Sequence, residues 1–132
     1  SMQQTMETGV GNLRGRLRAM LAAKTPAMAR LAVVDAVMER ALSERERSLL
    51  AAVPGLLAGH FQRLREAEQH MLADAEAPAD DAAAPVATAA APAVTPGTWL
   101  DTFRKDMQSV LLAELDVRLQ PVEGLLAALR TR

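Results

Sequence analysis

The chain has 132 residues, a net charge of −1 and 27 alanines, but no cysteine, no tyrosine, two phenylalanines and one tryptophan. Without cysteine it forms neither disulfides nor cysteine-ligated zinc sites, and its charge lacks the basic footprint of a nucleic-acid binder. β-branched and aromatic residues are few, whereas Ala, Leu, Arg, Glu and Met are abundant. This composition argues against sheets and favours helices. No apolar run reaches the roughly 18 residues of a membrane-spanning helix. We therefore expect a cytoplasmic, all-α chain of one-domain size.

The first predicted helix runs from about Gln3 to Lys24. Its apolar residues recur at spacings of four and three, which is typical of a coiled-coil-like seam; they are Met6, Val10, Leu13, Leu17 and Met20. Three glycines interrupt the other faces of this helix, each at a cost of up to ~1 kcal/mol. We expect this helix to need a partner surface.

A second helix is predicted to begin at Thr25-Pro26, because a threonine cap followed by proline is a typical helix start. It continues to about Leu42, and its apolar residues share one face, formed by Met28, Leu31, Val34, Met38 and Leu42. Asp35 is an acid within an otherwise apolar run. Because burying an unpaired carboxylate is expensive, Asp35 either faces outward or pairs with an arginine of another helix.

The third helix is predicted from Ser43 to about Asp74. Ser43 with Glu46 three residues later has the pattern of a capping box, which favours a new helix start at this point. The stripe of this helix comprises Leu50, Val53, Leu57, Phe61, Leu64 and Met71. Pro54, followed by glycine, lies inside the pattern and is expected to kink or briefly break the helix.

Residues 75–97 differ in composition from the rest of the chain. Eleven of these 23 residues are alanine and four are proline. This composition predicts a flexible or partly extended linker, with an ordered crossover along the bundle as the alternative. The chain therefore divides into a three-helix part at 1–74, a linker at 75–97 and a C-terminal helix at 98–132.

The last helix is predicted to run from Trp99 to about Gln120, with Thr98 and Asp101 forming its cap. Its apolar residues are Leu100, Phe103, Met107, Val110, Leu111 and Leu115. Pro121 is expected to kink or end it, before a short helix at 122–130. The predicted architecture is an antiparallel bundle of about four long amphipathic helices, kinked at Pro54 and Pro121, which oligomerisation can complete. The long linker leaves the direction of the last helix open.

Ionisable residues offer two weak chemical candidates. Glu66, His70 and Asp74 share a helix face and can be viewed as metal ligands of an enzyme or sensor, but a solvated polar face is the favoured interpretation. Glu114 and Asp116 can be viewed as an acid–base pair, although ion pairs with Arg118 or Arg30 are favoured. Because no nucleophile–base pair or phosphate loop accompanies them, we assign no catalytic residue, cofactor or metal, and expect a non-enzyme.

The first helix also carries cations opposite its apolar stripe, at Arg14, Arg16, Arg18 and Lys24. This combination suits a peripheral contact with an anionic membrane surface or envelope complex. The three arginines alternate, however, and so spread around the helix. A solvated face of the bundle is therefore the favoured interpretation of these charges.

Two stretches of the chain support a resemblance to a known family. The first runs from Gly11-Asn12-Leu13-Arg14-Gly15-Arg16-Leu17-Arg18 to Arg45-Glu46-Arg47-Ser48-Leu49-Leu50, and the second is Leu111-Leu112-Ala113-Glu114-Leu115-Asp116-Val117-Arg118-Leu119-Gln120-Pro121-Val122. Together they resemble an uncharacterised family of proteobacterial domains of unknown function. The resemblance implies that this chain is the C-terminal portion of longer members. It implies no activity, cofactor or site residue.

The leading hypothesis is a non-enzymatic helical module that binds a protein partner or a second copy of itself. Its predicted contact residues are Leu13, Leu17 and Met20 on the first helix, with Trp99 and Phe103 at the start of the last. The alternative is binding to an anionic membrane surface or envelope complex, for which Arg14 and Arg18 supply the charge. A metal-dependent enzyme or sensor that uses His70 comes third.

Overall fold

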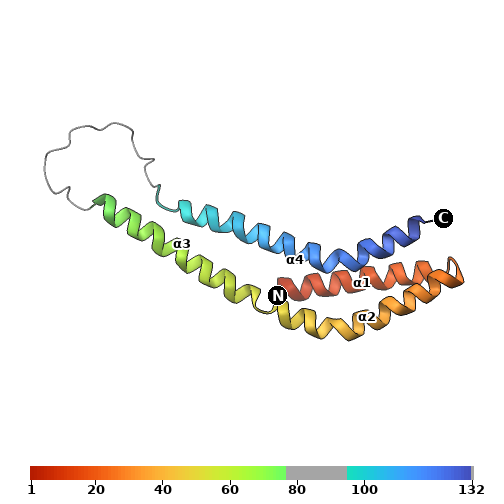
Figure 1. The fold of residues 1–132 in the computed structure, drawn as a ribbon. Helices are drawn as coiled ribbons and strands as arrows, with labels where there is room; N and C mark the ends of the chain where they lie inside the picture. The colour runs from red at the N-terminus through yellow and green to blue at the C-terminus, as the bar shows by residue number, and fades with distance from the viewer. Residues whose placement is uncertain (77–94, 132) are drawn as a thin grey trace. The chain divides into compact units, whose positions relative to one another are not determined.

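The computed structural model describes residues 1–76 and 95–131. These residues form four α-helices, α1 (Met2–Ala22), α2 (Pro26–Leu50), α3 (Val53–Glu76) and α4 (Thr98–Arg130) (Figure 1). No strand occurs within these two ranges, so the all-α prediction is confirmed. Most of the predicted linker, residues 77–94, lies outside the described residues.

The junction between α1 and α2 is the one that the sequence predicts. Thr25 has extended backbone angles, and its side-chain oxygen accepts a hydrogen bond from the Met28 N–H at 3.1 Å. Pro26 occupies the first position of α2, where its missing N–H costs no helical hydrogen bond. A side-chain cap and a proline therefore start α2 at this residue.

The predicted helix start at Ser43 is wrong. α2 continues through Ser43 and Glu46 to Leu50, and the break falls at residues 51–52. Serine and glutamate are tolerated inside a helix, and a capping box determines a start only where the chain has already left helical geometry. Pro54 lies in the first turn of α3, a position that accommodates proline without loss of a hydrogen bond.

Pro121 does not end the last helix. α4 runs without interruption from Thr98 to Arg130, with Pro121 inside it. The proline ring removes one backbone donor and crowds the preceding turn. Leu119, Val122 and Leu125 on either side pack into a core, and this packing supports continuation of the helix.

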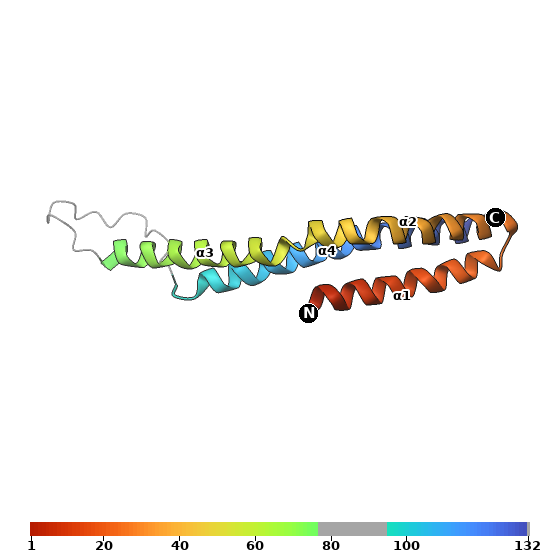
Figure 2. The same ribbon diagram turned by 90° about the horizontal axis from the view of Figure 1, so that it is seen from below.

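The described residues form two compact units, which we treat separately. Unit 1 comprises Ser1–Ala52 and α4 from Val110 onward, and unit 2 comprises the described residues between Val53 and Ser109. Within unit 1, α1 and α2 form an antiparallel pair, and α1 also lies beside the end of α4 (Figures 1 and 2). Gln3 at the start of α1 contacts Glu114, and Lys24 after its end contacts Leu129. α4 therefore runs parallel to α1 here.

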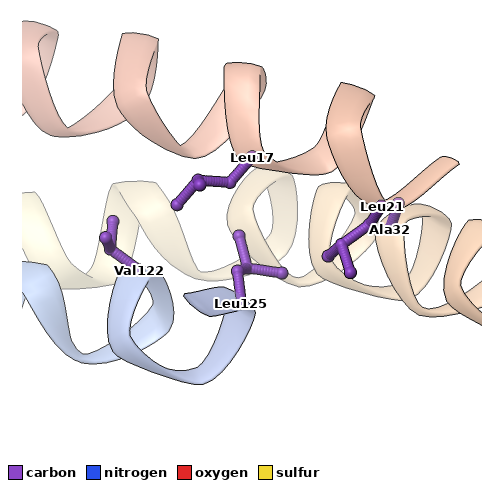
Figure 3. Packing of buried hydrophobic residues seen from close by; sticks show 5 residues of the cluster. All are labelled: Leu17, Leu21, Ala32, Val122 and Leu125. Carbon is purple, nitrogen blue, oxygen red and sulfur yellow. The ribbon is translucent and has the colours of Figure 1, made fainter. Parts of the chain in front are cut away.

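The apolar core of unit 1 lies between these three helices (Figure 3). Its buried residues are Leu17 and Leu21 of α1, Ala32 of α2, and Val122 and Leu125 of α4. Of the apolar stripe predicted for the second helix, Met28 packs against this cluster. The other four members of that stripe are exposed, namely Leu31, Val34, Met38 and Leu42. The apolar stripe predicted for the second helix is therefore mostly exposed.

Unit 2 joins α3 to the start of α4 through aromatic rings. The ring of Phe61 packs edge-on against Trp99 and Phe103, with centroid distances of 4.9 and 5.1 Å. Gly97, which has a φ of +90° suited to glycine, leads into α4. The buried carboxylate of Glu68 on α3 accepts hydrogen bonds from the backbone N–H groups of Gly97 and Trp99. A side chain of α3 therefore caps α4.

Candidate functional site

The inward face of α2 carries a buried carboxylate. Asp35 is 9% exposed and receives two hydrogen bonds from the Arg14 guanidinium of α1, at 2.7 and 2.8 Å. Arg18, one turn further along α1, donates to Asp35 at 3.0 Å and to Glu39 at 3.2 Å. The prediction that Asp35 either faces outward or pairs with an arginine of another helix is confirmed in its second form. Two cations and two anions join α1 to α2.

This charge network shifts the ionisation of its members. Burial alone would raise the pKa of Asp35, but hydrogen bonds and charges from Arg14 and Arg18 outweigh it and lower that pKa. Burial alone would lower the pKa of Arg18, whereas its bonds to Glu39 and Asp35 raise it. Both groups are therefore held in their charged forms, as a structural ion pair requires.

A second buried pair lies on α4. The Arg118 guanidinium contacts the Glu114 carboxylate at 3.0 Å, and the Gln3 amide donates to the same carboxylate oxygen at 2.9 Å. Arg118 also lies 3.6 Å from Glu46 of α2. The prediction of an ion pair between Glu114 and Arg118 is confirmed. Glu114 Oε2 and Arg118 Nε are buried without a hydrogen-bond partner among the described residues.

A groove of about 820 Å³ is formed by residues of α1, α2 and the end of α4. Its charged lining residues are Glu7, Arg14, Arg18, Asp35, Glu39, Arg40, Glu46, Arg47 and Arg118. Most of these bond to one another, and Glu7 pairs with Arg47. The apolar lining comes mostly from α2, with contributions from α1 and α4; it includes Leu31, Val34, Met38, Leu42, Val10, Pro121 and Leu125. The groove therefore offers paired charges beside an aliphatic wall.

The outward side of α2 is aliphatic. Val33, Val34, Val37 and Met38 are between 50% and 63% exposed. Around them on the helix lie further exposed residues, namely Arg30, Ala41 and Glu44. We call these seven residues the outer face of α2. Its members recur at three- and four-residue spacing. Val33 and Val37 lie opposite Asp35, whereas Val34 and Met38 lie at the edge of this face and also line the groove.

The predicted contact residues have mixed locations. Leu13 and Met20 are exposed, whereas Leu17 is buried in the core. Arg14 and Arg18 bond to Asp35 and Glu39, as described above. In unit 2, Trp99 and Phe103 are half-buried against Phe61. The structure therefore brings Leu17, Arg14 and Arg18 together on the inward side of α1, but not with Leu13 and Met20.

The histidines lie in different surroundings. Glu66, His70 and Asp74 are exposed on α3, and within residues 1–76 and 95–131 no group of three His, Cys, Asp or Glu side chains is placed to hold a metal. His60 is half-buried, and its Nε2 lies 2.7 Å from a carboxylate oxygen of Asp106 on α4. This pair joins α3 to α4 beside the aromatic cluster.

The outer face of α2 was not predicted from the sequence. Val33 and Val37 were absent from the predicted stripe, because the spacing of the larger residues pointed to Leu31, Val34, Met38 and Leu42. The available signal was Asp35. Once that carboxylate is paired with an arginine of α1, the residues two positions before and after it lie on the opposite half of the helix and face outward.

Among the described helices, none combines the length and apolarity needed to cross a bilayer.

Comparisons with known proteins identify the family. No curated protein and no solved structure matches the chain. The profile of a family described as "Protein of unknown function (DUF3348)" matches residues 1–131. The expectation that this chain is the C-terminal portion of longer members is not borne out by that match. The chain belongs to the DUF3348 family, a family of proteins of unknown function.

Proposed function

We propose that this chain is a non-enzymatic helical module for protein–protein interaction. The observation that supports the proposal is the outer face of α2. Four large aliphatic side chains there are at least half exposed and adjoin one another. Each Å² of apolar surface left in water forgoes about 25 cal/mol of stabilisation, and contiguous apolar patches rimmed by polar groups are typical of interaction sites.

The interior of unit 1 supports the same proposal. Asp35 is held by two arginines, so rotating α2 about its axis would leave a buried charge unpaired, at a cost of about 3–5 kcal/mol. The ion pairs therefore fix the orientation of α2. A helix oriented by its polar side keeps its aliphatic side available to a partner.

A protein partner is favoured over an anionic membrane surface. The membrane alternative needs Arg14 and Arg18 to face lipid headgroups, but both guanidinium groups bond to carboxylates of α2. Side-chain exposures of 12% for Arg14 and 21% for Arg18 leave little of either cation for a second anion. The aliphatic side chains of the outer face of α2, by contrast, are at least half exposed and can pack against apolar side chains of a protein partner.

Site-specific photo-crosslinking in the native host cells tests this proposal. A benzophenone amino acid is placed at Val37 on the outer face, and at Leu112 on α4 as the control. The two positions are similarly exposed, at 60% and 58%. We expect a discrete protein adduct from Val37 and little or none from Leu112. Failure of Val37 to yield any adduct in a correctly folded, well-expressed protein would overturn the proposal.

A further inference from the structure

Three residues of the outer face of α2 are arranged symmetrically. Arg30, Val37 and Glu44 are each seven residues apart, which is two helical turns, so they lie on nearly one line along the helix. All three are exposed. Within residues 1–76 and 95–131, neither Arg30 nor Glu44 takes part in an ion pair, although most other charges of unit 1 between Glu7 and Arg47 are paired. Opposite charges therefore lie at equal distances on either side of a valine.

This arrangement is complementary to itself when reversed. We infer that the occupant of the outer face is a second copy of the chain, whose α2 lies antiparallel across it with a two-fold axis near Val37. Arg30 of each copy then faces Glu44 of the other, so two equivalent ion pairs form. This inference rests on the proposed function and names its partner.

The apolar residues meet in the same register. In an antiparallel pair centred on Val37, residues whose numbers add up to about 74 lie opposite one another. Val37 then meets its own symmetry mate, and Val33 meets Ala41, so a large side chain packs against a small one at each flank. All three side chains are exposed in the single chain. The interface thus has an apolar centre and charged ends.

The charges also determine whether the two α2 helices pair in parallel or antiparallel orientation. In a parallel pair, Arg30 would face Arg30 and Glu44 would face Glu44, which is repulsive at both ends. Arg40 and Arg45 are exposed beside the central line rather than on it. At such rim positions, water and salt screen their charges. The antiparallel arrangement is therefore the one that the central line favours.

Charge reversal tests the pairing. Sedimentation equilibrium is measured on the full chain and on Arg30→Glu, Glu44→Arg and the double variant, at low ionic strength. We expect the parent to dimerise, each single reversal to weaken dimerisation at least tenfold, and the double reversal to restore it to within about threefold. Restoration separates a lost ion pair from misfolding, because a variant damaged in folding is not rescued by a second reversal. A monomeric parent, or a double variant no tighter than either single one, would overturn the inference.

Cysteine crosslinking tests the direction. Because the chain has no cysteine, Val37→Cys introduces a single thiol, and Ser48→Cys is a matched control on the same line of α2. In the antiparallel pair, two thiols at 37 lie near the axis, whereas two at 48 are separated by about 33 Å along the helices. A short bismaleimide should join Val37→Cys copies but not Ser48→Cys copies. Equal crosslinking of both variants indicates a parallel pair and contradicts the inference.

These outcomes are distinguishable from failure of the proposed function. If photo-crosslinking at Val37 captures a different protein while the purified chain stays monomeric, the interaction module stands and the second copy is wrong. If Val37 captures nothing in cells and the purified chain is monomeric, both are wrong. Homodimers captured at Val37, with rescue by double charge reversal, support both.

Discussion

Unit 1 buries charged side chains against one another, whereas unit 2 packs aromatic rings. In unit 1, Asp35, Glu114 and Arg118 are among the most buried residues, beside a small apolar cluster. In unit 2, Phe61 contacts both Trp99 and Phe103, and Glu68 caps the adjoining helix. Ion pairs specify orientation because a misplaced charge is costly, while aromatic rings contribute buried area. The ion pairs on the polar side of α2 therefore orient this helix, and its apolar side faces outward.

The largest loss of stability is expected when the ion network of unit 1 is broken. Asp35→Ala leaves the partly buried guanidinium groups of Arg14 and Arg18 short of a partner, so we expect a loss of about 3 kcal/mol in the free energy of unfolding. Urea denaturation followed by far-UV circular dichroism measures it. Asp116→Ala, at an exposed position of α4, is the control and should change stability by less than about 0.5 kcal/mol. Equal effects of the two variants would refute the structural role of Asp35.

The next effect concerns the aromatic cluster of unit 2. Phe61→Ala removes the ring that contacts Trp99 and Phe103, and because Phe61 is half-buried we expect a loss of about 2 kcal/mol. Trp99 is the only tryptophan, so its fluorescence reports unfolding of unit 2 specifically. Gln62→Ala, next to it and exposed, serves as control. An unchanged fluorescence midpoint in Phe61→Ala would show that the rings do not hold unit 2 together.

A smaller effect is expected at the cap of α4. Glu68→Ala removes the acceptor of the Gly97 and Trp99 N–H groups, so we expect a loss of about 1 kcal/mol, typical of a helix cap. Glu66→Ala, exposed on the same helix, is the comparison variant. Both are measured by the urea midpoint of Trp99 fluorescence. If the Glu66 variant proves the more destabilising, Glu68 is not the cap that matters.

The last and, near neutral pH, the smallest expected effect is on how the free energy of unfolding of unit 1 depends on pH. The pKa of Asp35 is lowered in the folded state, so its stabilisation is fully present above its ordinary pKa of about 4 and is lost as the pH falls through the lowered value. We therefore expect little change between pH 7 and 5 and a steep loss below about pH 4. In Asp35→Asn this part of the loss should be missing. A parent and variant with parallel stability curves down to pH 2 would contradict the assignment.

Local features of the fold were predictable because their physical causes are local. The cap and proline at Thr25-Pro26 determine a helix start wherever α2 packs. Pro54, next to a glycine, marks the region of the break between α2 and α3 at residues 51–52. The capping pattern at Ser43 was misleading, because the same residues are acceptable inside a helix. In α4, the core packing of Val122 and Leu125 supports the helix beyond Pro121.

The candidate surface was only partly predictable. Sequence periodicity locates an apolar stripe on a helix, but burial depends on what lies opposite. The sequence left Asp35 either facing outward or paired with an arginine, and only the packing of α1 showed that it is paired, with Arg14 and Arg18. With that side turned inward, Val33 and Val37 became exposed. The contact set proposed on the first helix was divided, since Leu17 lies in the core and Met20 does not.

Three features could be predicted from the sequence, namely the helical class, the start of α2, and the need of Asp35 either to face outward or to pair with an arginine. They follow from helix propensity, capping and the cost of burying charge. Three other features could not be predicted in this way: α4 runs parallel to α1, Glu68 of α3 caps α4, and α2 directs its polar side inward. The reason is the same in each case: these features depend on contacts between residues far apart in the chain, which no local pattern encodes.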